Sequence, residues 1–131
     1  MTGIAERPRL SPLTDRQVDK LREQLAADRE QTERLITSLR IDMGAFVNAR
    51  RDAATDDESD PEGPTLAFER SQSSAMLTQA SGHLGEIDAA IERMDDGVYG
   101  LCTVCNGPVA LGRLQARPQA SLCISCAGRV R

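Results

Sequence analysis

The stretch that decides the fold is Cys102-Thr-Val-Cys105, followed after 17 residues by Cys123-Ile-Ser-Cys126. These four cysteines are the only ones in the chain. A gap of two residues lets both thiolates of a pair point into one tight turn, and two such turns complete the four-sulfur tetrahedron that zinc prefers. Because four thiolates leave no open coordination position, the pattern predicts one structural Zn²⁺ and not a catalytic one.

Two other interpretations of the cysteines are a pair of disulfides and a redox-sensitive zinc site. Two disulfides would suit a secreted protein, but the start of the chain, Met1-Thr2-Gly3-Ile4-Ala5, has no apolar stretch typical of a secretory signal. Reduced thiols and a cytoplasmic location are therefore expected. A zinc site that releases its metal on oxidation stays open as an alternative, because any thiolate cluster can be oxidised.

Composition limits what kind of core the chain can build. Only 2% of its 131 residues are aromatic, namely Phe46, Phe68 and Tyr99. A chain with so few large side chains needs another source of stability, such as a metal or a long helical seam. With 16 basic and 20 acidic residues the net charge is −4, which argues against a general nucleic-acid-binding surface. No apolar run approaches the length of a membrane span.

A long helix is predicted from residue 15 to residue 55, after a loose tail at 1–13. Thr14-Asp15-Arg16-Gln17 has the form of a capping box, in which the first and last side chains satisfy each other's backbone N–H groups. Apolar residues then recur at helical spacing, with a gap at Asp28 and Thr32. They are Val18, Leu21, Leu25, Leu35, Ile36, Leu39, Met43 and Phe46.

Residues 56–64 are predicted to form an acidic turn. They contain five acidic residues together with Pro61 and Pro64, and a helix cannot continue through this composition. Asp60 before Pro61 also suits the cap of a following helix, so its charge has a structural explanation as well as a functional one.

A second helix is predicted over residues 65–96, with Gly97 as a left-handed C-cap. Its apolar stripe has the 3,4 spacing of a coiled-coil seam: Leu77, Ala80, Leu84, Ile87, Ile91 and Met94. The expected fold is mostly α, a long antiparallel helical hairpin (14–96) with its acidic tip at 56–64, and a small four-cysteine zinc-finger module at 97–131. Folding about residue 60 would set Met94 opposite Ala26, leaving residues 15–25 to pack on the zinc module.

The C-terminal quarter carries a family resemblance. The phrases Gly97-Val-Tyr-Gly100-Leu-Cys102-Thr-Val-Cys105 and Arg113-Leu-Gln-Ala-Arg-Pro118, followed by the second cysteine pair, resemble the DksA/TraR family of bacterial transcription factors. The resemblance covers residues 97–126. In the hairpin, Asp60-Pro61-Glu62-Gly63 and Ala67-Phe68-Glu69-Arg70 look like those of actinobacterial members.

This resemblance implies a mechanism without catalysis. Family members insert the hairpin into the secondary channel of bacterial RNA polymerase, place an acidic tip near its catalytic centre, and often act together with the alarmone ppGpp. The tip residues implied here are Asp57, Asp60 and Glu62. Glu62 is a departure, because the best-characterised members have a small residue at that position. Asn106 is a second departure, since the family usually has Gly there, although Asn tolerates the left-handed conformation that the turn needs.

Two further function classes fit the sequence beside a polymerase-binding regulator. A zinc-finger protein that binds nucleic acid directly would use the basic residues near the C-terminus, Arg113, Arg117, Arg129 and Arg131. That basic cluster could equally meet polymerase or the phosphates of an alarmone. An adaptor would use the coiled coil to bind another protein. An enzyme is not expected: Ser71, Ser73 and Ser74 have no base partner at a recognisable spacing.

Overall fold

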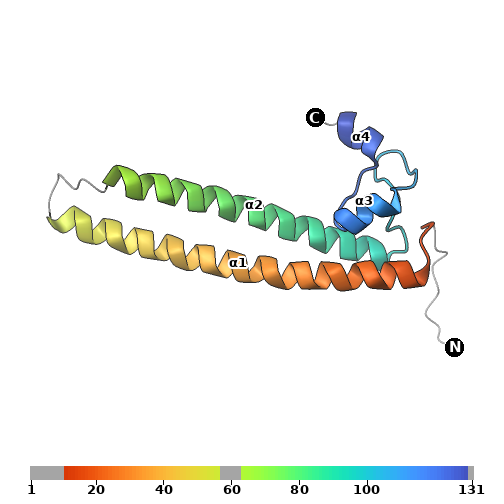
Figure 1. The fold of residues 1–131 in the computed structure, drawn as a ribbon. Coiled ribbons are helices and arrows are strands. Elements are labelled where there is room, and N and C mark those ends of the chain that lie inside the picture. The colour runs from red at the N-terminus through yellow and green to blue at the C-terminus, as the bar shows by residue number, and fades with distance from the viewer. Residues whose placement is uncertain (1–10, 57–62, 130–131) are drawn as a thin grey trace. The chain divides into compact units, whose positions relative to one another are not determined.

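The computed structural model describes residues 11–56 and 63–129, and within these ranges it contains four helices and no strand. The helices are α1 (Asp15–Asp56), α2 (Gly63–Asp95), α3 (Leu111–Ala116) and α4 (Ile124–Arg129). Figure 1 shows their order. The predicted fold class is confirmed: two long helices precede a small module that holds the four cysteines.

The chain divides into two compact units. One combines Met1–Arg29 with Gly85–Arg131, and the other is Glu30–Leu84. Each long helix therefore contributes one part to each unit. The division into a tail, a hairpin and a zinc module, which the sequence suggested, stays a prediction.

The start of α1 is fixed by the predicted capping box. The backbone N–H of Thr14 donates to Oε1 of Gln17 at 2.9 Å, and the backbone N–H of Gln17 donates to Oγ1 of Thr14 at 3.1 Å. Two N–H groups that lack a partner in the first turn of a helix are thus satisfied reciprocally. This part of the sequence prediction is confirmed.

The end of α2 is a Schellman motif around Gly97, which has φ 77°. The N–H of Gly97 donates to the carbonyl of Met94 at 3.1 Å, and the N–H of Val98 donates to the carbonyl of Arg93 at 3.0 Å. Glycine has no Cβ to clash in this left-handed conformation, so the helix ends here with its last carbonyls satisfied. The predicted C-cap is confirmed.

Two ion pairs set the register of α1 against α2 in the first unit. Arg22 bonds Asp95 at 3.0 Å and Arg29 bonds Asp88 at 2.7 Å, so seven residues on one helix match seven on the other in the antiparallel sense. The side chains are partly exposed and each pair contributes at most about 1 kcal/mol. The two ion pairs show which residues of α1 lie opposite which residues of α2. This pairing differs by about one helical turn from the expected match of Met94 with Ala26.

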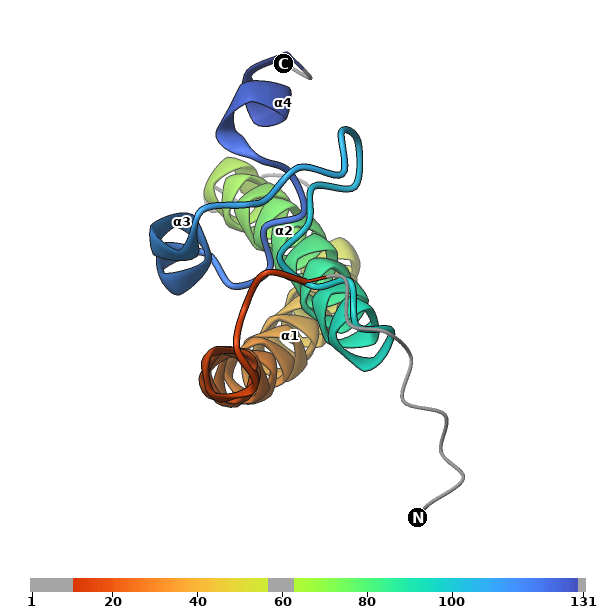
Figure 2. The same cartoon turned by 90° about the vertical axis from the view of Figure 1, so that its right-hand side faces the viewer.

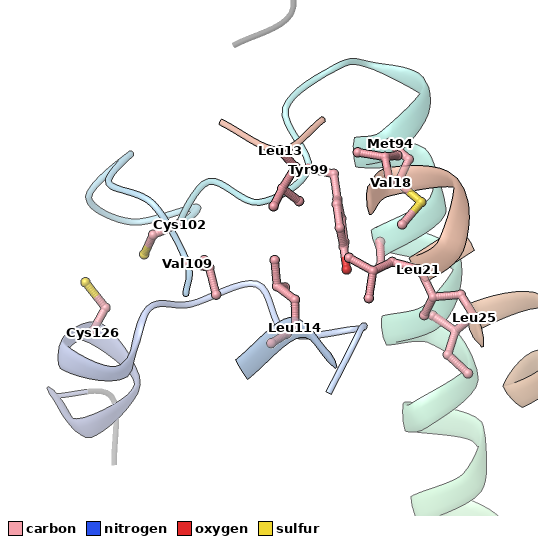
Figure 3. Packing of buried hydrophobic residues seen from close by; sticks show 13 residues of the cluster. Leu13, Val18, Leu21, Leu25, Met94, Tyr99, Cys102, Val109, Leu114 and Cys126 are labelled. Carbon is pink, nitrogen blue, oxygen red and sulfur yellow. The ribbon is translucent and has the colours of Figure 1, made fainter. Parts of the chain in front are cut away.

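The core of the first unit joins both long helices to the cysteine-bearing segment. Figure 2 shows the first turns of α1 beside the last turns of α2, with α3 near both. In Figure 3, Tyr99 lies between Leu13 and the α1 side chains. Residues 15–25 therefore pack on the zinc module, as expected. The buried residues include Val18, Leu21 and Leu25 from α1, Ile87, Ala90 and Met94 from α2, and Tyr99, Val109 and Leu114 beyond them.

The second unit has a narrower seam. Among the side chains of this unit that the structure describes, at 30–44 and 64–84, the buried ones are Thr32, Ile36, Leu39 and Ala80. Thr32, a gap in the predicted stripe, is only 6% exposed. Leu35, a member of that stripe, is 43% exposed. The stripe therefore passes through Thr32 and Ile36, at the coiled-coil spacing, and Leu35 lies at its edge.

The proposed tip residues Asp57, Asp60 and Glu62 lie outside the described residues. The structure bears on what precedes and follows them: α1 continues to Asp56, and α2 begins at Gly63 with Pro64 in its first turn. Proline suits a first turn because its missing N–H would have no partner there.

Candidate metal centre

The first cysteine pair, Cys102 and Cys105, lies in a turn held by its own backbone. The N–H of Cys102 donates to the carbonyl of Gly107 at 2.7 Å, and the N–H of Asn106 donates to the carbonyl of Cys102 at 2.9 Å. Asn106 has φ 61°, the left-handed conformation expected for it. The N–H of Gly107 lies 3.4 Å from Sγ of Cys105, so this turn also supplies a donor to a sulfur.

Gly100 brings the N-terminal segment against this turn. It has φ 93°, and a Cβ at this position would lie 2.9 Å from Cδ1 of Leu13 and 3.1 Å from Oγ of Ser11. Glycine is required here twice, for its backbone conformation and for the close approach of a neighbouring segment. The sequence motif Gly-x-Tyr-Gly before Cys102 thus has a packing reason.

The second pair, Cys123 and Cys126, spans the start of α4. The N–H of Ala127 donates to the carbonyl of Cys123 at 2.9 Å, which continues the turn into the helix. The two pairs are joined by a backbone bond from the N–H of Thr103, inside the first pair, to the carbonyl of Ser121 at 2.9 Å. The chain around each cysteine pair is therefore tied to the chain around the other.

The four predicted ligands come together. All four Sγ atoms lie within 4.8 Å of one another, and the Cys105 and Cys123 sulfurs are 3.8 Å apart. A zinc–sulfur distance of about 2.3 Å in a regular tetrahedron places sulfurs about 3.8 Å apart, so this spacing fits the metal. Figure 3 shows the sulfurs of Cys102 and Cys126 pointing toward each other. All four cysteines are free thiols, not disulfides.

The surroundings already favour thiolate at part of the site. Backbone N–H groups, first of all that of Cys105, lower the pKa of Cys102 to about 6. The pKa of Cys123 is also lowered, chiefly by the N–H of Cys126. The pKa of Cys126 is raised to about 12 by its sulfur neighbours, Cys123 first. Binding of a divalent cation would favour the thiolate form of all four cysteines and so release the remaining protons.

The metal centre is closed to substrate. Cys102 and Cys126 are buried, while Cys105 is exposed at the surface. A four-thiolate site fills the coordination sphere of zinc, and the metal then acts as a cross-link between two chain segments. The residues fit one Zn²⁺ held by Cys102, Cys105, Cys123 and Cys126.

A hollow lies beside this centre in the same unit. Its volume is about 570 Å³, and its polar lining includes Arg113, Arg117, Ser121 and Glu86. Arg113 and Arg117 belong to the basic cluster singled out in the sequence; Arg129 is exposed but does not line the hollow, and Arg131 lies outside the described residues. Sequence reasoning missed Glu86, because nothing in the helical stripe of α2 indicates which of its exposed acids faces α3 and α4.

Comparisons with known proteins place the cysteine module in a family. Residues 97–131 match the model of the prokaryotic dksA/traR C4-type zinc finger. Two relatives are named RNA polymerase-binding transcription factor DksA. The one from Caulobacter vibrioides is 39% identical over 46 residues, which is 35% of this chain and 32% of that protein. The one from Haemophilus influenzae is 39% identical over 41 residues, 31% of this chain and 28% of that protein.

The whole fold also has a counterpart. The structure of transcription factor DksA2 from Pseudomonas aeruginosa matches with a TM-score of 0.72 and 25% identity, covering 95% of both chains. The sequence matches, in contrast, span about a third of the length of the curated relatives. In the ranges that the structure describes, no helix is long and apolar enough to cross a membrane.

Proposed function

We propose, from the match of residues 97–131 to the dksA/traR zinc finger and from the DksA2-like fold, that this chain is a non-catalytic regulator of transcription that binds bacterial RNA polymerase. The observation that carries the proposal is the combination of a C4 zinc finger of this family with a DksA2-like fold over 95% of the chain. The two relatives described above are named for polymerase binding. A cytoplasmic location follows from this partner.

The parts of the chain take different roles in this proposal. The paired helices supply reach, and the acidic residues between them, Asp57, Asp60 and Glu62, supply the contact with a basic channel that contains Mg²⁺. Zinc, when bound, supplies a cross-link that fixes the two cysteine pairs. The capping box at Thr14 starts α1 and the Schellman motif at Gly97 ends α2, both in the same unit as the metal centre.

The experiment is a purified transcription assay with bacterial RNA polymerase and the double variant Asp57→Asn, Asp60→Asn. Asparagine caps a helix about as well as aspartate, so the variant removes charge and keeps the capping role that the sequence suggests for Asp60. We expect the effect on initiation to weaken. Polymerase binding should persist, because the rest of the hairpin and the zinc module provide most of the contact.

A matched control removes the same charge elsewhere. Asp19 and Asp42 are exposed residues of α1, and Asp19→Asn, Asp42→Asn should regulate initiation like the parent. If the tip variant also regulates initiation like the parent, the tip does not act through its charge. The next variant to test would then replace Glu62 by a small residue. A parent protein that fails to bind polymerase favours the adaptor alternative instead.

The resemblance also implies ppGpp, and we propose the hollow beside the metal centre as its place. Arg113 and Arg117 can pair with phosphate oxygens there, although Glu86 opposes an anion in the same hollow. Binding of labelled ppGpp is measured in the presence of polymerase. Loss of binding in Arg117→Met and stronger binding in Glu86→Gln, relative to the parent, would support this position for ppGpp. Equal binding by all three proteins would place ppGpp elsewhere.

A further inference from the structure

The segment 118–122, which leads directly into Cys123, is held by hydrogen bonds to its carbonyl oxygens. We call it the carbonyl segment. The donors all come from outside it. The Tyr99 hydroxyl donates to Pro118 at 2.8 Å, Nη2 of Arg93 to Ala120 at 3.4 Å, the N–H of Thr103 to Ser121 at 2.9 Å, and Nε of Arg113 to Leu122 at 2.9 Å.

These four donors come from four separate parts of the chain, and Tyr99 lies between α2 and the first cysteine pair. Arg93 lies in the last turn of α2, Thr103 lies within the first cysteine pair, and Arg113 lies in α3. The carbonyl segment is therefore bound by its neighbours even though it forms no helix or strand. Its position determines where the second cysteine pair stands relative to the first.

Of the four carbonyls bound in this way, the one that Arg113 binds is nearest in sequence to Cys123. Nε of Arg113 donates to the carbonyl of Leu122, the residue directly before Cys123. Because a peptide group is planar, fixing that carbonyl also fixes the N–H of Cys123 and the direction in which the chain enters the cysteine. The sulfur of Cys123 then lies 3.8 Å from that of Cys105, at the spacing that zinc requires.

We propose that Arg113 is a positioning residue of the metal centre, which holds Cys123 at tetrahedral spacing, with Tyr99 and Arg93 holding the upstream part of the same segment. Preorganised ligands lose less freedom when the metal binds, so the metal is held more tightly. Residues that hold a metal ligand in place without contacting the metal typically change metal affinity 10- to 100-fold when they are replaced. The proposal concerns metal retention and does not depend on binding to polymerase.

A second role for Arg113 has to be separated from this one. Four thiolates and one Zn²⁺ carry net negative charge, and any nearby arginine would stabilise them electrostatically. Arg117 offers the comparison, because it lies one helical turn further on and also lines the hollow. A charge effect would appear in both variants and shrink in high salt, whereas a hydrogen bond to Leu122 belongs to Arg113 alone.

The experiment measures zinc release from the full-length, zinc-loaded protein to an excess of a chelating dye. We expect Arg113→Met to release zinc about 10- to 100-fold faster than the parent, at low and high salt alike, and Arg117→Met to release it at the parent rate. The helical signal of the zinc-loaded variants should be unchanged. Release from Arg113→Met at the parent rate, or equal acceleration in both variants, would overturn the proposal.

A second variant covers the case in which Arg113→Met does not fold. Tyr99→Phe removes only the hydroxyl that donates to Pro118 and keeps the buried ring. It should also release zinc faster than the parent, by less than Arg113→Met, because its bond lies five residues from Cys123. Titration with Co²⁺ checks the same order, since the weaker sites need more metal to reach the full thiolate–cobalt absorption. An unchanged Tyr99→Phe would contradict the role assigned to the segment.

Discussion

The Tyr99 hydroxyl donates a hydrogen bond at 2.8 Å to the carbonyl oxygen of Pro118, which lies 19 residues further along the chain. The ring is only 1% exposed and packs in the core that joins the long helices to the metal centre. One side chain thus contributes apolar contact at its ring and a polar bond at its tip. Burial raises the pKa of Tyr99 to about 12, although the nearby positive charge of Arg93 acts in the opposite direction.

Tyr99 should make the protein less stable at high pH. Its neutral form is favoured in the folded state, so its contribution is complete below the unfolded pKa of about 10 and is lost as pH rises toward about 12. Tyr99 is the only tyrosine and the chain has no tryptophan, so phenolate absorbance reports this residue alone. A titration midpoint near 10 in the folded protein would contradict the prediction, and Tyr99→Phe should lack this loss of stability.

Loss of one cysteine should remove the metal. Cys102→Ser takes away a buried ligand, and zinc binding in small domains is largely folding energy. We expect elemental analysis to find less than one zinc per chain, and hydrogen exchange to rise over residues 97–129 while most of α1 and α2 stays helical. Ser125→Ala, an exposed change inside the second cysteine pair, should keep one zinc. A Cys102→Ser protein with a full zinc content would contradict the ligand set.

Truncation of Ile87 should be costly. This side chain is 0% exposed in the core of the first unit, and Ile87→Ala should lower the free energy of unfolding by about 2–4 kcal/mol. The same change at Ile41, which is 66% exposed, should cost under about 0.5 kcal/mol. Urea unfolding of both variants gives the comparison. Equal losses at the two positions would contradict the burial pattern and the register that goes with it.

The capping box should contribute measurably to the start of α1. Thr14→Ala leaves the N–H of Gln17 without its partner and should cost about 0.5–2 kcal/mol in unfolding free energy. Thr37→Ala, at an exposed position inside α1, should be neutral or slightly stabilising because alanine is the better helix former. If both threonine variants behave alike in urea unfolding, the box seen here does not stabilise the protein.

The sequence predicted the features that depend on local chemistry. The capping box, the C-cap at Gly97, the left-handed turn at Asn106 and the cysteine pairs each follow from a few neighbouring residues. Register was harder. The sequence does not fix how many residues around 56–64 belong to the turn, so it allows pairings of the two helices that differ by several residues, and the ion pairs place the pairing about one turn from the expected match.

The contacts of the metal centre were missed for a different reason. Arg93 and Arg113 use their guanidinium groups on backbone carbonyls, and a backbone carbonyl has no signature in a sequence. Thr32 counts as a gap in a stripe defined by apolar side chains, yet its position in the heptad places it in the seam. Heptad position was the better guide at this residue than side-chain type.

The core of the first unit has a consequence for synthesis on the ribosome. Leu25 is buried among side chains that include Ile87 and Leu114, which leave the ribosome much later. At roughly 5–20 residues per second, the stretch between Leu25 and Leu114 takes about 5–18 s to translate. During that time the apolar stripe of α1 has no final partner in this unit, so newly made chains should be substrates for chaperones that bind amphipathic helices.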